Sequence, residues 1–295
     1  MLMQQARLPG QSNLIQQALI RFSRLEPQPN AGYWLLAADI AQQQHQFTRA
    51  KAALEQAAQL QQQPQIPLMQ ARIALVEAKP EQAMRYCQQL LTLQELFLFE
   101  LCSLEVAGRN GQLANSYPLL QRVAKRNDIP AELRLYLQAV LAEQAEQLQQ
   151  PVIAAQHLEP WLAQAPVPIW LKWADLLMTT APQRVYAQLN KLAHELQLED
   201  ALLLRLARAE QLVKAGNRHL AAVTERIALR ERRQDLLHSA DLTYFYLFLQ
   251  ADNAKARRYA FINYQQAKEP DDLKLAQLSG WTQTELASLT KKGIL

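Results

Sequence analysis

The sequence predicts an all-α fold, a right-handed α-solenoid of about seven helix–turn–helix pairs followed by a terminal cap. Only 7 of the 295 residues are glycine, which argues against sheets joined by tight hairpins. Apolar residues make up 49% of the chain and charged residues 20%, as in a folded protein with a large core. Apolar residues recur at helical spacing, and small residues return at intervals of about 34 residues.

The clearest helix pair runs from Gly32 to Pro64. Trp34 stands at the first position of the tetratricopeptide signature. Ala38 and Ala50 stand at its small positions, one on each helix, and small side chains let two helix backbones approach closely. We therefore expect these two alanines at the contact between the helices.

No polar linker divides the chain, so we expect one domain over residues 1–295. The first twelve residues are polar and are expected to be loose. In the third repeat, which starts near Glu95, we assign the two small positions to Cys102 and Ala114. The predicted parts of the domain are a lead-in helix over 13–26, repeats over about 31–268 and a C-terminal cap over 270–292.

A solenoid of this kind exposes a concave wall formed by the first helix of each repeat. Positions beside the small position of each first helix should face it. Apolar pockets edged by mixed charge suit a peptide or a helical segment of a partner protein. We therefore expect an interaction scaffold or assembly adaptor whose partner the sequence does not name. The predicted partner-binding residues are Asp39, Leu68, Arg72, Phe99, Ser103, Asp175 and Glu210.

A second hypothesis rests on a basic stripe along one later helix. Arg226, Arg230 and Arg233 follow at helical spacing with Arg232 beside them. One interpretation is a solvated face paired with neighbouring carboxylates, and the other is a nucleic-acid-binding patch. A net charge of +4 is too small to favour nucleic acid by itself. Steep loss of binding with salt would indicate nucleic acid.

No motif indicates catalysis, a metal or a cofactor. The five histidines stand singly, with no His or Cys three or four residues away. There is no nucleophile elbow and no glycine-rich phosphate loop. We therefore expect a protein that is not an enzyme and holds no cofactor.

Cys87 and Cys102 flank the predicted turn near Gln94 at similar distances. An antiparallel helix pair would place them at the same height, close enough to bond. Two buried reduced cysteines are one interpretation and a disulfide is the other. A disulfide would fit an exported protein.

No segment is long and apolar enough to predict a membrane span. The most apolar run, Leu242 to Leu249, is far shorter than the roughly 20 residues required. The first residues lack the apolar region of a signal peptide. We expect either a cytoplasmic protein or one exported after removal of a leader.

The part of the chain after Glu199 carries a family resemblance. DALLLRLARAE precedes an arginine-rich helix, and Asn263-Tyr264, Lys268-Glu269-Pro270 and Asp272-Leu273 follow. These segments resemble the C-terminal part of a family of uncharacterised bacterial tetratricopeptide-repeat (TPR) proteins, with Tyr264 in place of Trp and Lys268 in place of Arg. The resemblance covers roughly the whole chain and is strongest after Glu199. It implies a TPR-like fold and export, because members of that family are generally exported, and it implies no activity.

Overall fold

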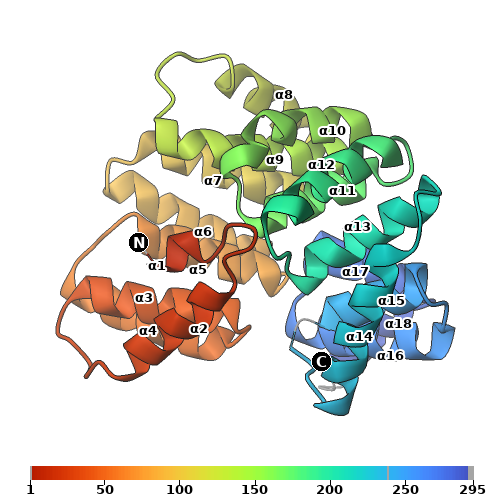
Figure 1. Ribbon diagram of the computed structural model, residues 1–295. Coiled ribbons are helices and arrows are strands. Elements are labelled where there is room, and N and C mark those ends of the chain that lie inside the picture. The colour runs from red at the N-terminus through yellow and green to blue at the C-terminus, as the bar shows by residue number, and fades with distance from the viewer. Residues whose placement is uncertain (1, 238, 292–295) are drawn as a thin grey trace. The chain divides into compact units, whose positions relative to one another are not determined.

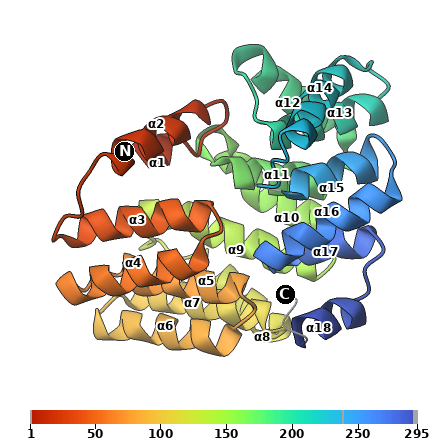
Figure 2. The ribbon, with the colours of Figure 1, turned by 90° about the horizontal axis from the view of Figure 1, so that it is seen from below.

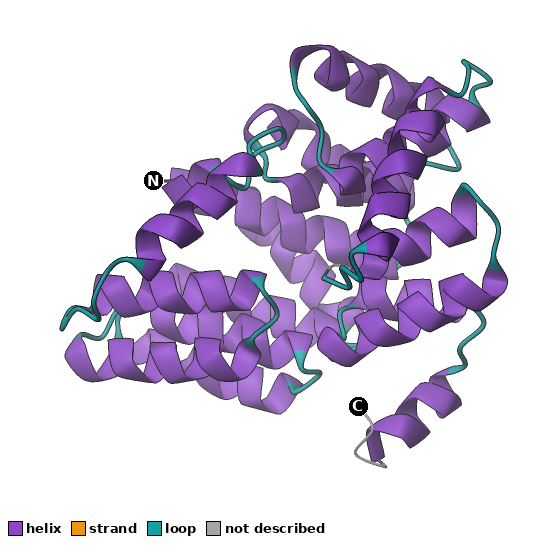
Figure 3. Ribbon diagram, turned by 60° about the horizontal axis from the view of Figure 1, so that its bottom comes forward, coloured by secondary structure: helices purple, strands orange, loops and turns teal. Residues whose placement is uncertain are grey.

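The computed structural model describes residues 2–237 and 239–291, and in those residues it contains helices and no strand (Figure 3). The chain packs as two compact units, Met1–Leu177 and Met178–Leu295. Figure 1 labels the helices in chain order. The helices of the first unit are α1 (Leu2–Gln5), α2 (Asn13–Ser23), α3 (Ala31–Gln43), α4 (Phe47–Leu60), α5 (Gln65–Val76), α6 (Pro80–Thr92), α7 (Leu96–Arg109), α8 (Leu113–Val123), η1 (Ala131–Leu133), α9 (Arg134–Gln147), α10 (Pro151–Leu158), η2 (Glu159–Gln164) and α11 (Val167–Leu177).

The second unit is built in the same way from consecutive helices. Its helices are α12 (Pro182–Glu195), α13 (Asp200–Leu212), α14 (Arg218–Arg232), α15 (Ser239–Phe248), α16 (Asn253–Gln266), α17 (Pro270–Leu278) and α18 (Gln283–Lys291). The structure therefore confirms the all-α class and a helical-repeat arrangement. No helix in the described part of the chain has the length and hydropathy needed to cross a membrane.

One turn geometry recurs between the paired helices of the first unit. The second residue after the end of the first helix has a positive φ: 55° at His45, 59° at Ala78, 80° at Gly111 and 59° at Gln149. In each turn the next residue donates its N–H to a carbonyl five residues back, at 2.8–2.9 Å. This closes the helix in the manner of a Schellman motif. Only Gly111 adopts the left-handed region without a steric cost.

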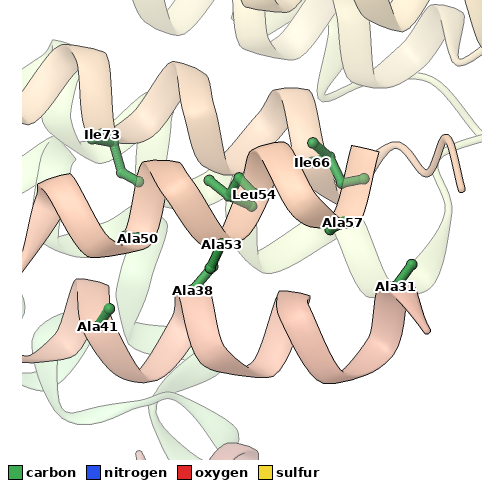
Figure 4. Close-up of a cluster of buried hydrophobic side chains, with 9 residues drawn as sticks. All are labelled: Ala31, Ala38, Ala41, Ala50, Ala53, Leu54, Ala57, Ile66 and Ile73. Carbon is green, nitrogen blue, oxygen red and sulfur yellow. The ribbon is translucent and has the colours of Figure 1, made fainter. Parts of the chain in front are cut away.

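The first pair packs as the sequence predicted. Ala38 on α3 and Ala50 on α4 are completely buried, as is Leu54. Figure 4 shows Ala38 pointing towards Ala53, with the α4 side chains between α3 and α5. Trp34 is partly buried against this cluster. Small side chains thus bring the helix axes together and larger ones fill the space around the contact.

The third pair is shifted relative to the prediction. Ala114 is exposed, and the small buried residue at the start of α8 is Ser116. The Ser116 hydroxyl donates to Gln144 Oε1 at 2.8 Å, and Gln144 Nε2 donates to the carbonyl of Leu104 at 2.8 Å. A Cβ added to Gly108 would lie 2.3 Å from Gln144 Nε2, so the glycine makes room for this buried amide. Gln144 from α9 thus hydrogen-bonds to both helices of the third pair, α7 and α8, and fixes their alignment.

The expectation of a loose start is wrong for the described residues. Met3 and Ala6 are 7% and 3% exposed. Met3 packs against Ala18 on α2 and Ile40 on α3. Hydrophobic burial therefore holds the first helix in place, although the surrounding sequence is polar.

Helices α17 and α18 occupy the range of the predicted cap, and residue 292 lies outside the described residues. Pro270 begins α17, where its missing N–H costs nothing. Glu269 and Asp272 form a reciprocal capping box around it. Burial raises the pKa of Asp272 to about 7, and the Glu269 carboxylate adds to the shift.

Candidate functional site

Four charged side chains occupy equivalent places on consecutive first helices of the first unit. Each lies six residues before the positive-φ residue of the following turn, and each is half-buried. They are Asp39 on α3, Arg72 on α5, Glu105 on α7 and Glu143 on α9. We call these four residues the charged row. Asp39 and Arg72 were both named from the sequence, and counting back six residues from Gly111 would also have found Glu105.

The centre of the charged row joins three helices. The guanidinium of Arg72 lies over the ring of Tyr136, 4.3 Å from its centroid. The Tyr136 hydroxyl donates to the Glu105 carboxylate. Burial raises the pKa of Tyr136 well above its usual value, and the Glu105 charge adds to the shift. The phenol therefore stays a hydrogen-bond donor at neutral pH.

The far end of the charged row is an ion pair with an unusual carboxylate. Arg109 Nη2 donates to Glu143 Oε2 at 2.9 Å. The pKa of Glu143 is raised to about 7 by burial and, to a smaller extent, by the Glu105 charge, although Arg109 and Lys172 oppose the shift. Lys172 itself pairs with Glu146 at 2.8 Å.

At the near end, Asp39 forms an ion pair with Arg7 from the segment before α2. Every member of the charged row thus has a partner inside the first unit. The charged row stabilises the packing of the first helices, and its charges are already matched.

A separate apolar pocket of about 440 Å³ lies beside α7. Three leucines line it, one each from α6, α7 and α8, and each is exposed to solvent. Leu91 is 43% exposed, Leu96 66% and Leu119 38%. The pocket is lined by Leu91, Leu96, Phe99, Glu100, Ser103, Leu104 and Leu119.

Phe99 and Ser103 were expected on the same face as Asp39 and Arg72, and this is wrong. They lie on the pocket side of α7, two residues out of step with the charged row. Cys102 was taken as the small position because it is small, whereas the turn at Gly111 aligns Leu104 with Ala38 and Ala71. The Ser103 Oγ is buried and has no hydrogen-bond partner in the structure.

The remaining predicted partner-binding residues, Leu68, Asp175 and Glu210, each contact other residues of the protein. Leu68 packs against the buried cluster around Cys87 and Cys102. Asp175 is half-buried on α11 and already interacts within the protein. Glu210 is only 3% exposed, and its carboxylate accepts the backbone N–H groups of Arg218 and His219 at 3.2 and 2.9 Å. Glu210 is therefore a helix-start cap on α14, which corrects its assignment to a binding surface.

Two of the four arginines of the basic stripe on α14 form internal contacts. Arg226 pairs with Asp200 at 3.1 Å and donates to the Leu198 carbonyl at 2.8 Å. Arg230 pairs with Asp241 at 3.2 Å and is 12% exposed. These two arginines join α14 to α13 and α15 and are corrected from patch residues to packing residues. Arg232 and Arg233 are exposed.

Cys87 on α6 and Cys102 on α7 are joined by a disulfide, with Cα atoms 5.7 Å apart. This separation is typical of a disulfide between closely packed helices. Both residues are almost completely buried. Leu91 is one helical turn beyond Cys87, and Ser103 follows Cys102, so the bond joins the two helices directly beside the pocket.

No cluster of three or more His, Cys, Asp or Glu side chains that could hold a metal ion occurs among the described residues. The first unit thus offers an apolar pocket for contact with a partner and a charged row that packs its own helices. In comparisons with known proteins, no family model matches the chain, and no curated protein matches it either.

Proposed function

We propose that this protein is a partner-binding scaffold, a tetratricopeptide-like solenoid that acts by docking and not by catalysis. The observation that carries the proposal is the apolar pocket, where Leu91, Leu96 and Leu119 remain exposed side by side. Contiguous exposed apolar surface is costly in water and typically marks an interaction site. The charged row has matched charges and leaves the apolar pocket as the better candidate for docking.

The chemistry of the pocket favours an amphipathic helical segment that carries acidic residues. Leu96, Phe99 and Ser103 follow one face of α7 over about two helical turns, which suits apolar side chains at helical spacing. Arg122 is three residues beyond Leu119 and on the same side of α8. Arg126 lies at the rim, with its guanidinium 2.9 Å from Glu100 and 5.5 Å from the centre of the Phe97 ring. Arg126 also donates to Asp128 at 2.8 and 2.9 Å, so its charge is already matched. An acidic group of a partner would complement the exposed Arg122.

The cysteine pair supports a further part of the proposal, that the protein works in an oxidising compartment. Disulfides persist in exported proteins and are rare in the cytosol. The resemblance to an exported TPR family, stated above for the residues after Glu199, points the same way.

The test uses two synthetic 14-residue helical peptides with leucines at i, i+3 and i+7, one with Glu and one with Lys at the remaining polar positions. We expect the Glu peptide to bind the full chain at least tenfold more tightly than the Lys peptide, and to keep part of its affinity at high salt because apolar contacts are not screened. Leu96→Ser and Leu119→Ser should each weaken binding about tenfold. Leu60→Ser, which changes a 47% exposed leucine on α4, is the matched control and should bind normally. Equal binding by all three variants would contradict the proposal.

A further inference from the structure

Residues 3–10, which we call the leading segment, cross from α3 to the start of α11 within the first unit. Arg7 forms an ion pair with Asp39 of the charged row. The carbonyl of Arg7 accepts the backbone N–H of Val167 at 2.8 Å. Figure 2 shows α1 and α2 beside α3. A segment near the start of the chain therefore contacts the first helices of the first and the last repeat of this unit.

The leading segment is held as a bound peptide is held. Its buried side chains recur at every third position: Met3, Ala6 and Pro9. Gln4, Gln5 and Arg7 between them are exposed. Apolar groups thus face the protein while polar groups face solvent, and Arg7 pairs with the Asp39 carboxylate.

The leading segment is held by the burial of Met3 and Ala6, by one backbone hydrogen bond to Val167 and by the Arg7–Asp39 ion pair. The Arg7 side chain is 45% exposed, and ion pairs of that exposure contribute little because solvent screens them. Gly10 has a φ of 73° and turns the chain towards α2, which has its own contacts with α3 through Ala18. Release of the leading segment therefore costs its own contacts, while the contact between α2 and α3 can remain.

We infer that α3 and the start of α11 form a second peptide-binding surface, and that the leading segment occupies it in place of a partner. The partner segment has the same chemistry: apolar side chains at every third position around one arginine. This surface is distinct from the pocket beside α7, and the inference does not depend on the proposed function. A tethered occupant competes at a high effective concentration, so a partner binds well only when the leading segment is displaced.

The test titrates a fluorescent peptide of residues 2–11 against full-length protein. Arg7→Glu in the protein places two carboxylates together and releases the leading segment. We expect this variant to bind the peptide at least tenfold more tightly than the wild-type protein does. Arg24→Glu changes an exposed arginine at the end of α2 and is the matched control, with wild-type affinity expected.

A charge reversal then identifies the contact. Asp39→Lys also repels Arg7, and this variant should prefer a peptide with Arg7→Glu over the natural peptide by at least tenfold. Amide exchange at Val167 gives an independent readout and should accelerate in both variants because its acceptor has left. Equal affinities for all proteins, no preference after the charge reversal, or unchanged exchange at Val167 would each overturn the inference.

Discussion

The guanidinium of Arg72 on α5 lies 4.3 Å from the centre of the Tyr136 ring on α9, and the Tyr136 hydroxyl donates to Glu105 on the intervening α7. Three first helices are thus joined by one planar cation, one ring and one carboxylate. This contact requires the flat guanidinium, because a lysine ammonium cannot stack on a ring in the same way.

Replacing Arg72 by lysine should therefore lower the free energy of unfolding by about 1 kcal/mol, although the charge is kept. Urea denaturation measures the change. Arg85→Lys on the exposed side of α6 is the control and should change stability by less than about 0.5 kcal/mol. In a double-mutant cycle with Tyr136→Leu, the two changes should be non-additive, and additive values would show that the stacking contributes nothing.

The turn at Ala78 offers a stabilising substitution. Ala78 is exposed and has a φ of 59°, where a Cβ is strained. Ala78→Gly removes that strain and should raise the unfolding free energy by about 1 kcal/mol. Ala52→Gly, at an exposed position inside α4, should lower it by about 0.5–1 kcal/mol. Effects of the same sign in the two variants would show that the turn geometry is wrong.

Glu143 should make stability fall as the pH rises. Its folded pKa of about 7 lies above the ordinary value of 4.5 because of burial. Between those values Glu143 binds more protons in the folded chain than in the unfolded chain. Its contribution to the free energy of unfolding is therefore largest below about pH 4.5 and is lost as the pH rises through 7. The contribution is at most about 3 kcal/mol.

Glu143→Gln removes this titration. The stability difference between variant and wild type should therefore shift in favour of the variant between pH 5 and 8, as followed by urea midpoints at each pH. Asp272 has a pKa raised to the same value and contributes with the same sign, so it cancels in the difference. A difference that does not vary with pH would contradict the raised pKa of Glu143.

The disulfide should stabilise the first unit. Its two cysteines are 15 residues apart, and closing a loop of that size contributes about 3 kcal/mol by the chain-entropy model. Reduction should therefore lower the urea midpoint of the wild-type protein. A Cys87→Ala/Cys102→Ala variant should not respond to reductant. Thiol counting on denatured protein from its native compartment should find no free thiol, whereas two free thiols would argue against export.

The helix pairs could be predicted because their signals are local. Apolar spacing, a proline at the start of a helix and paired small residues such as Ala38 and Ala50 do not depend on distant contacts. The first helix was missed because its burial depends on Ile40, which is far along the chain. Tertiary contacts of this kind override a polar local sequence.

The candidate sites were harder to predict, for two physical reasons. The run from Leu96 to Val106 is apolar on more than one face, so the sequence does not say which leucine the neighbouring helices leave uncovered. Cys102 fits a small position by size, but its partner is Cys87, and the turn at Gly111 fixes the register instead. Glu210 resembled a groove residue because its use as a cap depends on where α14 begins.

The most direct test of docking at the pocket is site-specific photo-crosslinking in the native cell. A photoreactive residue is placed at Leu96, at Leu119 or, as the control, at Leu60 on α4. The account predicts that Leu96 and Leu119 capture the same partner through an amphipathic segment bearing carboxylates, and that Leu60 does not capture it. Capture of different proteins at Leu96 and Leu119, equal capture at Leu60, or no product at either pocket position would contradict the account.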